Sequence, residues 1–480
     1  MDSHKIYLYN TASKSKSEFK PLVSGKAGMY TCGPTVYHYA HIGNLRTFVF
    51  NDFLRRMLSY FGYEVNHVMN ITDVGHLTDD GDSGEDKMLK GARREKKTVW
   101  DVAKFYTDAF LLDCKKLNLL PASVLCKATD HIKEQIAMIE KLQENGLTYQ
   151  AGGNIYFDSS KLSDYGKLVG LDVSKISETQ ARVEGDSNKK NPHDFVLWFT
   201  KSKFDEQAMK WESPFGTGYP GWHIECSAMA SKYLGEQFDI HTGGMDLAPV
   251  HHINEIAQAE GAFGKTPWVK TWMHGEFLVL GKDEKMSKSS GNFLSLSSLE
   301  EKGFSGLDYR YFLLSGHYRK PLTFSFESLE GAKVARKRLQ EKIWSLKEKW
   351  AGVSLDKLGR DGLSEVALGY LEVFESRIAD DLNMPQVVAL VWDLLKDNDL
   401  SNNEKYILLM DFDNVFGLDL GAKKKEVEVP EEVAVLVTKR QAARVAKDWA
   451  KGDELRDKVR ALGYKIQDKP DGSFEIVRVN

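Results

Sequence analysis

The sequence predicts an α/β fold that begins with a parallel, Rossmann-like sheet, and three stretches support this prediction. Residues 28–30 are β-prone and lead into the turn Gly33-Pro34. Over residues 44–61, apolar side chains recur at three- and four-residue spacing, which indicates a helix. Residues 64–71 then alternate like a strand. Strand, glycine-bearing turn and helix in this order open a nucleotide-binding sheet, in which backbone N–H groups and the helix dipole face a phosphate.

The composition indicates a soluble chain of three or four domains, because 480 residues exceed what one hydrophobic core usually serves. The N-terminus lacks the apolar segment of a signal peptide, and no apolar run approaches the length of a membrane span. We therefore expect a cytoplasmic protein without membrane contact. Four cysteines are too few for a disulfide framework. With a formal net charge of −4, any RNA contact must come from local basic patches.

Changes of pattern divide the chain into five predicted segments. Residues 1–120 and 221–325 form the two halves of the Rossmann-like domain, and residues 121–220 form an insertion between them. A helical bundle follows at residues 326–420, and a small module at residues 421–480 ends the chain.

Local periodicity and turn signals predict the remaining elements. Further helices are expected at residues 98–117 and 130–145, from Pro249 onward, over most of 327–417, and at 431–449 and 453–462. Strands are expected at residues 5–9, 154–158, 195–199, 221–226, 238–241, 277–281, 464–468 and 474–479. The Gly-rich acidic stretch 76–86 and the lysine-rich stretch 423–430 are expected to be loops.

Two short runs indicate nucleotide chemistry, although the turn lacks both standard phosphate-loop motifs. His41-Ile42-Gly43-Asn44 stands at the start of the first predicted helix. Lys285-Met286-Ser287-Lys288-Ser289 follows the predicted strand at residues 277–281. A lysine pair alone is usually part of a solvated loop. In this order, the two runs resemble the HIGH and KMSKS signatures of class I aminoacyl-tRNA synthetases.

Four further residues have the chemistry of a metal site. His251 and Glu255 are four residues apart, so on a helix they share a face and can hold one ion. Cys32 and Cys226 lie at or near the ends of predicted strands, where ligands of a parallel sheet gather. Two thiolates, an imidazole and a carboxylate suit zinc. Spacing alone leaves open an ordinary helix-surface pair, because neither cysteine belongs to a C-x-x-C motif.

Longer phrases resemble the cysteinyl-tRNA synthetases over nearly the whole chain. These are residues 32–37, 70–73, 220–229, 243–247, 251–258, 285–289 and 444–457. The resemblance implies a class I synthetase fold with an insertion, a helical bundle and a C-terminal anticodon-binding module. It also implies one zinc ion per chain, bound by Cys32, Cys226, His251 and Glu255. Its contacts to the backbone of the substrate cysteine carry over to Gly33, Thr72, Trp222 and Asp246.

The chain departs from the family pattern at two positions. Asn44 stands where the HIGH signature has its second histidine, and Ile253 replaces the first glutamate of the usual His-His-Glu-Asn-Glu. An asparagine amide still donates a hydrogen bond to phosphate, and Ile253 is not at a ligand position. Both changes therefore suggest a divergent branch that keeps the activity.

The resemblance implies a two-step reaction. L-Cysteine and ATP, with Mg²⁺ accompanying ATP, give cysteinyl-adenylate and pyrophosphate, and the cysteinyl group then passes to tRNA(Cys). His41 and Asn44 are expected to donate to the ATP phosphates, and Lys285 and Lys288 to close over the triphosphate, with Lys288 in direct contact. The first step needs no general base, because the substrate carboxylate is already ionised at neutral pH.

The C-terminal module supplies the expected RNA contacts. Arg444, Lys447, Trp449, Lys451 and Arg456 place cations and an aromatic face in one short helical region. Phosphate contacts and base stacking are how single-stranded RNA loops are recognised. We expect anticodon recognition here by Arg444, Lys447, Trp449 and Arg456, in a protein that acts as a monomer.

Two other functions remain open from the sequence. A cysteine ligase that passes the same adenylate to a small amine resembles the catalytic half, but it does not need an anticodon module. A non-catalytic zinc-containing RNA-binding protein does not need the KMSKS run. Cysteine-dependent ATP–pyrophosphate exchange and tRNA charging separate the three.

Overall fold

A computed structural model describes residues 5–75, 87–162, 165–166, 186–201, 209–280, 293–349, 362–423, 429–468 and 474–478. The chain forms two compact units, Met1–Leu420 and Gly421–Asn480. Among the described residues, no helix is both long and apolar enough to cross a membrane.

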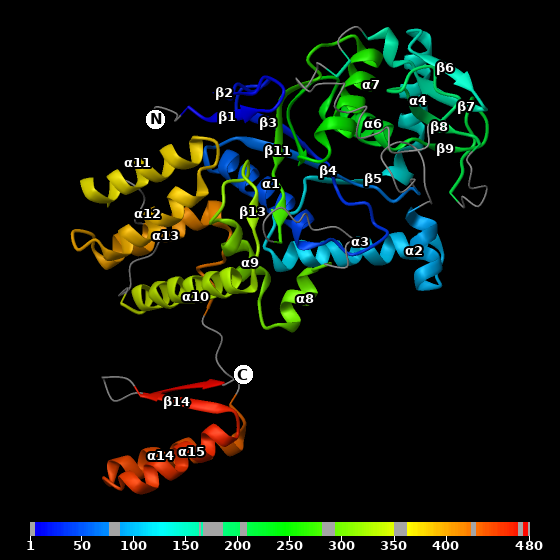
Figure 1. Cartoon of the computed structure of the whole chain (residues 1–480). Coiled ribbons are helices and arrows are strands. Elements are labelled where there is room, and N and C mark those ends of the chain that lie inside the picture. Colours follow the sequence, from blue (N-terminus) through cyan, green and yellow to red (C-terminus); the bar gives the residue numbers. More distant parts are fainter. Residues whose placement is uncertain are drawn as a thin grey trace. The chain divides into compact units, whose positions relative to one another are not determined.

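The centre of the first unit is a five-stranded parallel sheet in the order β11-β10-β3-β4-β5 (Figure 1). Its strands are β3 (Lys26–Thr31), β4 (Glu64–Ile71), β5 (Val124–Lys127), β10 (Phe238–Gly244) and β11 (Val269–Gly275). When these five strands are renumbered 1 to 5 by their order in the chain, the sheet has the doubly wound order 3-2-1-4-5. The direction of this order reverses between β3 and β10. Ligands of such sheets bind beyond the carboxyl ends of the strands at the reversal. The predicted α/β fold is confirmed.

Helices cover both faces of this sheet. Met29 and Tyr30, neighbours on β3, point to opposite faces. Met29 packs in the core that contains α1 (Ile42–Tyr60) and α3 (Val99–Lys116). Tyr30 packs in the core that contains α6 (Trp222–Leu234) and α7 (Ile253–Phe263). The predicted helices at residues 44–61 and 98–117 are thus present and support one face of the sheet.

The predicted strand at residues 221–226 is wrong, because these residues begin helix α6. Gly221 is the N-cap of α6, and its N–H donates to the carbonyl of Leu197 at 2.9 Å. A Cβ on Gly221 would lie 2.0 Å from the carbonyl oxygen of Val196, so only glycine fits at this turn. Almost every residue of α6 up to Ala230 is buried, and a helix buried on all sides lacks the periodicity that distinguishes it from a strand.

A second sheet, antiparallel, lies between β5 and β10 in the chain. It consists of β6 (Thr148–Ala151), β7 (Asn154–Phe157), β8 (Phe195–Phe199) and β9 (Tyr219–Pro220). Its inner face packs on α4 (Ile132–Glu144), α6 and α7 through one hydrophobic cluster (Figure 1). Residue 121 was the predicted start of the insertion. Strand β5, which follows it, still belongs to the parallel sheet, so the antiparallel sheet begins later in the chain.

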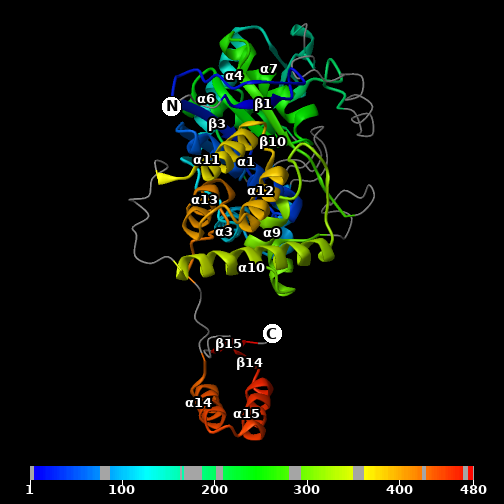
Figure 2. The ribbon, with the colours of Figure 1, turned by 90° about the vertical axis from the view of Figure 1, so that its left-hand side faces the viewer.

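The remainder of the first unit is mostly helical, and Figure 2 shows α11, α12 and α13 packed beside α1. Its elements are α8 (Leu296–Glu301), α9 (Gly306–Leu313), α10 (Phe326–Glu348), α11 (Glu365–Ala379), α12 (Met384–Lys396) and α13 (Asn402–Phe416). Two short strand pairs complete its described part, namely β1 (Tyr7–Asn10) with β2 (Ser15–Glu18), and β12 (Leu278–Val279) with β13 (Leu322–Thr323).

A buried arginine joins the helical part to the sheet. Arg310 of α9 is fully buried and donates to the Asp52 carboxylate of α1 at 2.6 Å. It also donates to the carbonyls of Phe416 and Leu117, which lie at the ends of α13 and α3. Four helices therefore share one charge-assisted junction beside α1.

The second unit is a pair of helices packed on a hairpin. It contains α14 (Glu431–Val445), α15 (Trp449–Ala461), β14 (Tyr464–Asp468) and β15 (Phe474–Arg478). Val433, Val437 and Val459 form its core with residues of β14. The predicted helix at 431–449 is too long, because Lys447 adopts a φ of 59° and separates the two helices.

Candidate active site

A cavity of about 790 Å³ opens where the strand order reverses. Its wall comprises the loop after β3, the N-terminus of α1, helix α2 (Lys87–Glu95), Trp222 of α6, and the turn after β10. The predicted residues Gly33, His41, Asn44, Trp222 and Asp246 all line it. The structure thus brings together side chains that are widely separated in the sequence.

The loop after β3 is held close to the end of β4. A Cβ on Gly33 would lie 1.6 Å from the carbonyl oxygen of Asn70, so this position accepts only glycine. The Asn70 side chain accepts a hydrogen bond from the Gly33 N–H at 2.8 Å and donates one to Thr72 Oγ1 at 3.0 Å. Thr72 is buried behind the loop, and its N–H donates to the Pro34 carbonyl at 3.1 Å. One amide side chain therefore orients both Gly33 and Thr72.

The two residues of the first signature cap helix α1. His41 Nδ1 accepts a hydrogen bond from the Asn44 N–H at 3.0 Å, and Asn44 Oδ1 accepts one from the His41 N–H at 3.3 Å. Asparagine is thus well suited to the position where the family pattern has histidine. The cap sets the helix N-terminus against the cavity, where its dipole favours an anion.

The predicted lysines Lys285 and Lys288 lie outside the described residues. Phe293, which follows that segment, lines the cavity and contacts the ring of His38, with ring centres 4.5 Å apart. Leu294 accepts a hydrogen bond from the Ile42 N–H at 2.8 Å. The chain therefore returns to the N-terminus of α1 directly after the lysine run.

The four predicted metal ligands converge on one point. Their ligand atoms, from Cys32, Cys226, His251 and Glu255, all lie within 4.8 Å of one another. The two sulfur atoms are 4.0 Å apart, and His251 Nε2 lies 2.9 Å from Glu255 Oε1. Two thiolates bound tetrahedrally to zinc at the usual bond length are about 3.8 Å apart. The four donors therefore fit zinc in both chemistry and spacing.

The electrostatics of this cluster also suit a cation. Burial, reinforced by Cys226 and Glu255, raises the pKa of Cys32 well above its ordinary value. Burial opposes ionisation of Glu255 as well, but His241 and His251 outweigh burial and lower the pKa of Glu255 to about 2. For Cys226, the hydrogen bond from Cys32 and the nearby His251 outweigh burial and lower its pKa to about 7. Buried acidic groups crowded in this way are neutralised by a dication, whose binding releases their protons.

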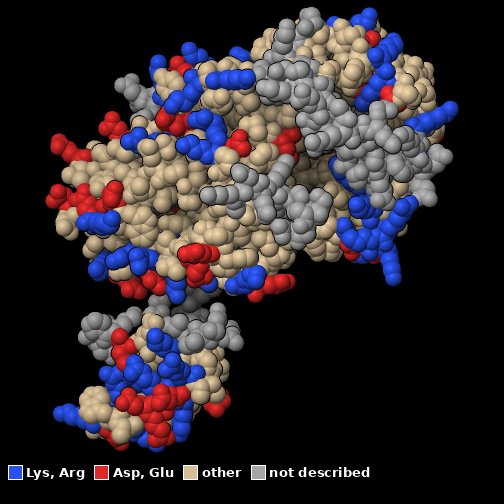
Figure 3. Space-filling view, in the orientation of Figure 1, with Lys and Arg blue, Asp and Glu red and all other residues tan. Residues whose placement is uncertain are grey.

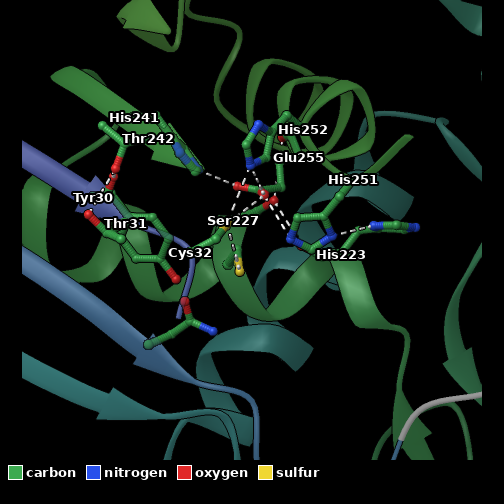
Figure 4. Close-up of polar contacts among 12 residues, drawn as sticks. Tyr30, Thr31, Cys32, His223, Ser227, His241, Thr242, His251, His252 and Glu255 are labelled. Atoms are coloured by element: carbon green, nitrogen blue, oxygen red, sulfur yellow. Dashed lines mark hydrogen bonds and ion pairs between the residues drawn. The ribbon is translucent and has the colours of Figure 1, made fainter. Parts of the chain in front are cut away.

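Additional histidines surround the predicted ligands, and sequence reasoning missed them. Figure 4 shows Glu255 between His241, His251 and His252. His223 lies 2.8 Å from His251, and His274 lies 2.7 Å from His252, measured between ring nitrogens. Cys32, His241, His252 and Glu255 form a second, overlapping donor set among the described residues. His241 lies at the centre of β10, a strand that the sequence predicted, and that position was the available signal. His274 lies near the carboxyl end of β11, which was not predicted.

The predicted RNA contacts lie together in the second unit. Trp449 is 59% exposed, and the Arg444 guanidinium lies 5.9 Å from its ring centre. Arg444 and Arg456 approach the Asp468 carboxylate, at 2.6 Å and 3.9 Å. Lys447 occupies the turn between the helices. The exposed indole therefore lies beside the Arg444 guanidinium, and the Asp468 carboxylate pairs with both arginines.

Two family models match the chain. The model described as "tRNA synthetases class I (C) catalytic domain" matches residues 18–334, and the model described as "Cysteinyl-tRNA ligase anticodon binding domain" matches residues 426–474.

Curated relatives match over nearly the full length. A cysteine–tRNA ligase of Treponema denticola is 48% identical, covering 97% of this chain and 98% of its own. Cysteine–tRNA ligase 1 of Burkholderia lata is 46% identical, covering 97% of this chain and 96% of its own.

Solved structures share the fold at low identity. A methionyl-tRNA synthetase of Mycobacterium tuberculosis bound to methionyl-adenylate superposes with a TM-score of 0.56 at 14% identity, covering 82% of this chain and 93% of that chain. A LeuRS of Agrobacterium radiobacter, in a ternary complex with tRNA, superposes with a TM-score of 0.57 at 12% identity, covering 83% of this chain and 84% of that chain.

Proposed function

The chain belongs to the cysteine–tRNA ligases, which are class I aminoacyl-tRNA synthetases, and from this premise we propose how its own residues carry out the reaction. L-Cysteine and Mg²⁺-ATP react in the cavity to give cysteinyl-adenylate, and the cysteinyl group then passes to tRNA(Cys). The observation that carries the proposal is the convergence of Cys32, Cys226, His251 and Glu255 beside the cavity that His41 and Asn44 line.

We assign recognition of cysteine to two sets of groups. Gly33, Trp222 and Asp246, on the wall, and Thr72 behind it hold the backbone of the amino acid, with the Asp246 carboxylate facing its ammonium group. Cys32, Cys226, His251 and Glu255 would hold one zinc ion, which would supply a Lewis acid that prefers a thiolate to a hydroxyl. Cys32 belongs to both the donor set and the cavity wall, so the ion would lie next to the substrate side chain.

Alignment and charge neutralisation suffice for the activation step. The substrate carboxylate is ionised at neutral pH and attacks the α-phosphate without a general base. His41 and Asn44 donate to the phosphates, with the N-terminus of α1 behind them, and Lys285 and Lys288 close over the triphosphate. Preorganised donors of this kind stabilise the charge that develops as pyrophosphate leaves.

Two assays test the proposed function. The purified protein should catalyse cysteine-dependent ATP–pyrophosphate exchange and should charge tRNA(Cys) with cysteine. Exchange without charging, together with cysteine transfer to a small amine, would instead identify a cysteine ligase. The absence of exchange would contradict an activating enzyme of either kind.

Replacing Lys288 should affect activation alone. We expect Lys288→Ala to slow adenylate formation by on the order of 10²-fold or more, because it removes one charge aimed at the triphosphate. Zinc content and cysteine binding should stay unchanged, since Lys288 is assigned to neither. The rate is measured by pyrophosphate exchange, with metal analysis as the control. A variant that loses cysteine affinity but uses ATP normally would contradict the role given to Lys288.

Removal of the second unit should separate charging from activation. A chain ending at Leu420 keeps the whole first compact unit and every residue assigned to catalysis. It should therefore exchange pyrophosphate like the full chain, whereas its KM for tRNA(Cys) should rise, because Arg444, Lys447, Trp449 and Arg456 are gone. Both chains are compared in exchange and charging assays. Equal charging by the two would remove anticodon recognition from the function of this unit.

A further inference from the structure

Helix α2 places a row of cations on one wall of the cavity. Lys87, Lys90 and Arg94 all line the cavity, and their spacing of three and four residues puts them on one side of the helix. The buried residues of α2, Met88 and Gly91, lie on the adjacent side of the helix. Asp246 is the one acidic side chain among the described residues of the cavity wall. The cavity side of α2 is therefore positive, although the Arg94 guanidinium is also paired with the Glu95 carboxylate at 2.9 Å.

The position of this helix is set by close contacts to the loop after β3. A Cβ on Gly91 would lie 3.1 Å from the Tyr37 carbonyl oxygen and 3.2 Å from Val102 Cγ1, so glycine allows α2 to approach the loop and α3 closely. The Arg94 guanidinium donates to the same Tyr37 carbonyl and to the Tyr106 hydroxyl, each at 2.9 Å. The row of cations is thus attached to the loop that carries Cys32 and His41.

One end of the row lies at the amino-acid end of the cavity. Lys87 Nζ is 5.1 Å from the centre of the Trp222 ring, the residue assigned to the substrate cysteine. From Lys87 the row continues through the exposed Lys90 to Arg94, about 10 Å along the helix axis. Figure 3 shows Lys and Arg side chains gathered over α2 on the right-hand side of the view. The cations therefore extend from the reacting centre to the surface.

The phosphates of ATP already have donors in the assignment above, at the N-terminus of α1 and in the lysine run. A second polyanion must reach the same centre, because the cysteinyl group is transferred to the 3′ end of tRNA. We propose that Lys87, Lys90 and Arg94 bind the phosphates of the single-stranded 3′-terminal nucleotides of tRNA and guide that end to the adenylate. This inference rests on the proposed function and assigns a role to a helix that the activation step does not use.

Lys90 gives the sharpest test, because Lys87 also touches Trp222 and Arg94 also holds the loop. Arg93 is the matched control: it is an exposed cation on the same helix, and it does not line the cavity. Full-length wild type, Lys90→Ala, Lys90→Arg and Arg93→Ala are compared in binding to tRNA(Cys) with and without its three 3′-terminal nucleotides.

Lys90→Ala should weaken binding of intact tRNA by about tenfold, the scale of one hydrogen bond to a charged group. Binding of the trimmed tRNA should not change, and the plot of log K against log salt for intact tRNA should become shallower by about 0.7. Lys90→Arg should restore binding, Arg93→Ala should resemble wild type, and pyrophosphate exchange should stay at the wild-type rate in every variant.

Three results would overturn the inference. An equal loss of affinity for intact and trimmed tRNA would place the contact elsewhere on the RNA. A fall in pyrophosphate exchange would assign Lys90 to ATP, and indistinguishable behaviour of Lys90→Ala and Arg93→Ala would remove any specific role. Failure of the proposed function would be recognised by a different result, because the wild-type protein itself would then exchange pyrophosphate without charging tRNA.

Discussion

Cysteine should be activated roughly 10⁴–10⁵ times more efficiently than serine, without hydrolytic editing. The two amino acids differ by one atom, so a pocket shaped for one also admits the other. The chain instead presents Cys32, Cys226, His251 and Glu255 in a buried cluster at the end of the pocket. With zinc bound there, a thiolate is an excellent partner and a hydroxyl is a poor one. A substrate that lacks the group a site is built to bind is rejected much more strongly than a substrate that differs only slightly in size.

This prediction is measured as the ratio of kcat/KM for the two amino acids in pyrophosphate exchange. When cobalt replaces zinc, cysteine should also produce a thiolate-to-metal charge-transfer band, and serine should not. The insertion that contains the antiparallel sheet β6–β9 should have no editing activity, so the protein should not deacylate seryl-tRNA. If activation proceeds while cysteine leaves the cobalt spectrum unchanged, the metal is structural and serine is excluded in another way.

Replacing His251 with alanine should abolish cysteine activation and greatly weaken the retention of zinc. The imidazole is buried, provides one of four donors, and lies 2.9 Å from Glu255. Its loss removes a ligand and leaves the buried Glu255 carboxylate with one fewer histidine partner. Removing a residue that only hydrogen-bonds to a metal ligand typically lowers metal affinity by about 10–100-fold, so losing a ligand itself should lower the affinity by at least this much. Metal content is measured by elemental analysis after dialysis against a chelator, alongside pyrophosphate exchange.

His131→Ala is the matched control for this variant. His131 is also a buried, hydrogen-bonded histidine, but its partners are the Lys127 carbonyl and the Tyr233 hydroxyl, outside the metal cluster. It should lose stability without losing zinc. Fully active His251→Ala protein that contains no metal would show that the cluster has been misassigned.

The sequence predicted the fold class and the donors for different reasons. The helix at α1 and the strand at β4 have strong local periodicity, and His251 with Glu255 depends only on a four-residue spacing that any helix preserves. The strand order does not follow from local pattern, because β3 pairs with β10, which lies about half of the first unit away along the chain. Predicted strand ends placed Cys32 and Cys226 at one edge of the sheet, although Cys226 lies in α6, and the resemblance to a known family then assigned both to one zinc site.

The missed elements depend on tertiary contacts. Helix α2 was not predicted: Gly91 usually disfavours a helix interior, and here it is required by the close approach to the Tyr37 carbonyl. The helical start of α6 was taken for a strand because it is buried almost throughout. Ile253 is fully buried among apolar residues that include Tyr30 and Phe238, which explains why this chain accepts an apolar side chain where the expected family pattern has glutamate.

The pairing of β3 with β10 also determines when the site can form during synthesis. Cys32 and Glu255 are separated by 223 residues, yet both belong to the same donor set. At the usual rates of translation, that interval takes about 11–45 s. For most of it, until β10 has been made, β3 lacks one of its neighbours in the sheet, and the Cys32 thiol emerges from the ribosome long before its partners. The metal site is therefore a late product of folding, and a nascent chain stalled before α7 would leave this cysteine available to oxidants and to other metals.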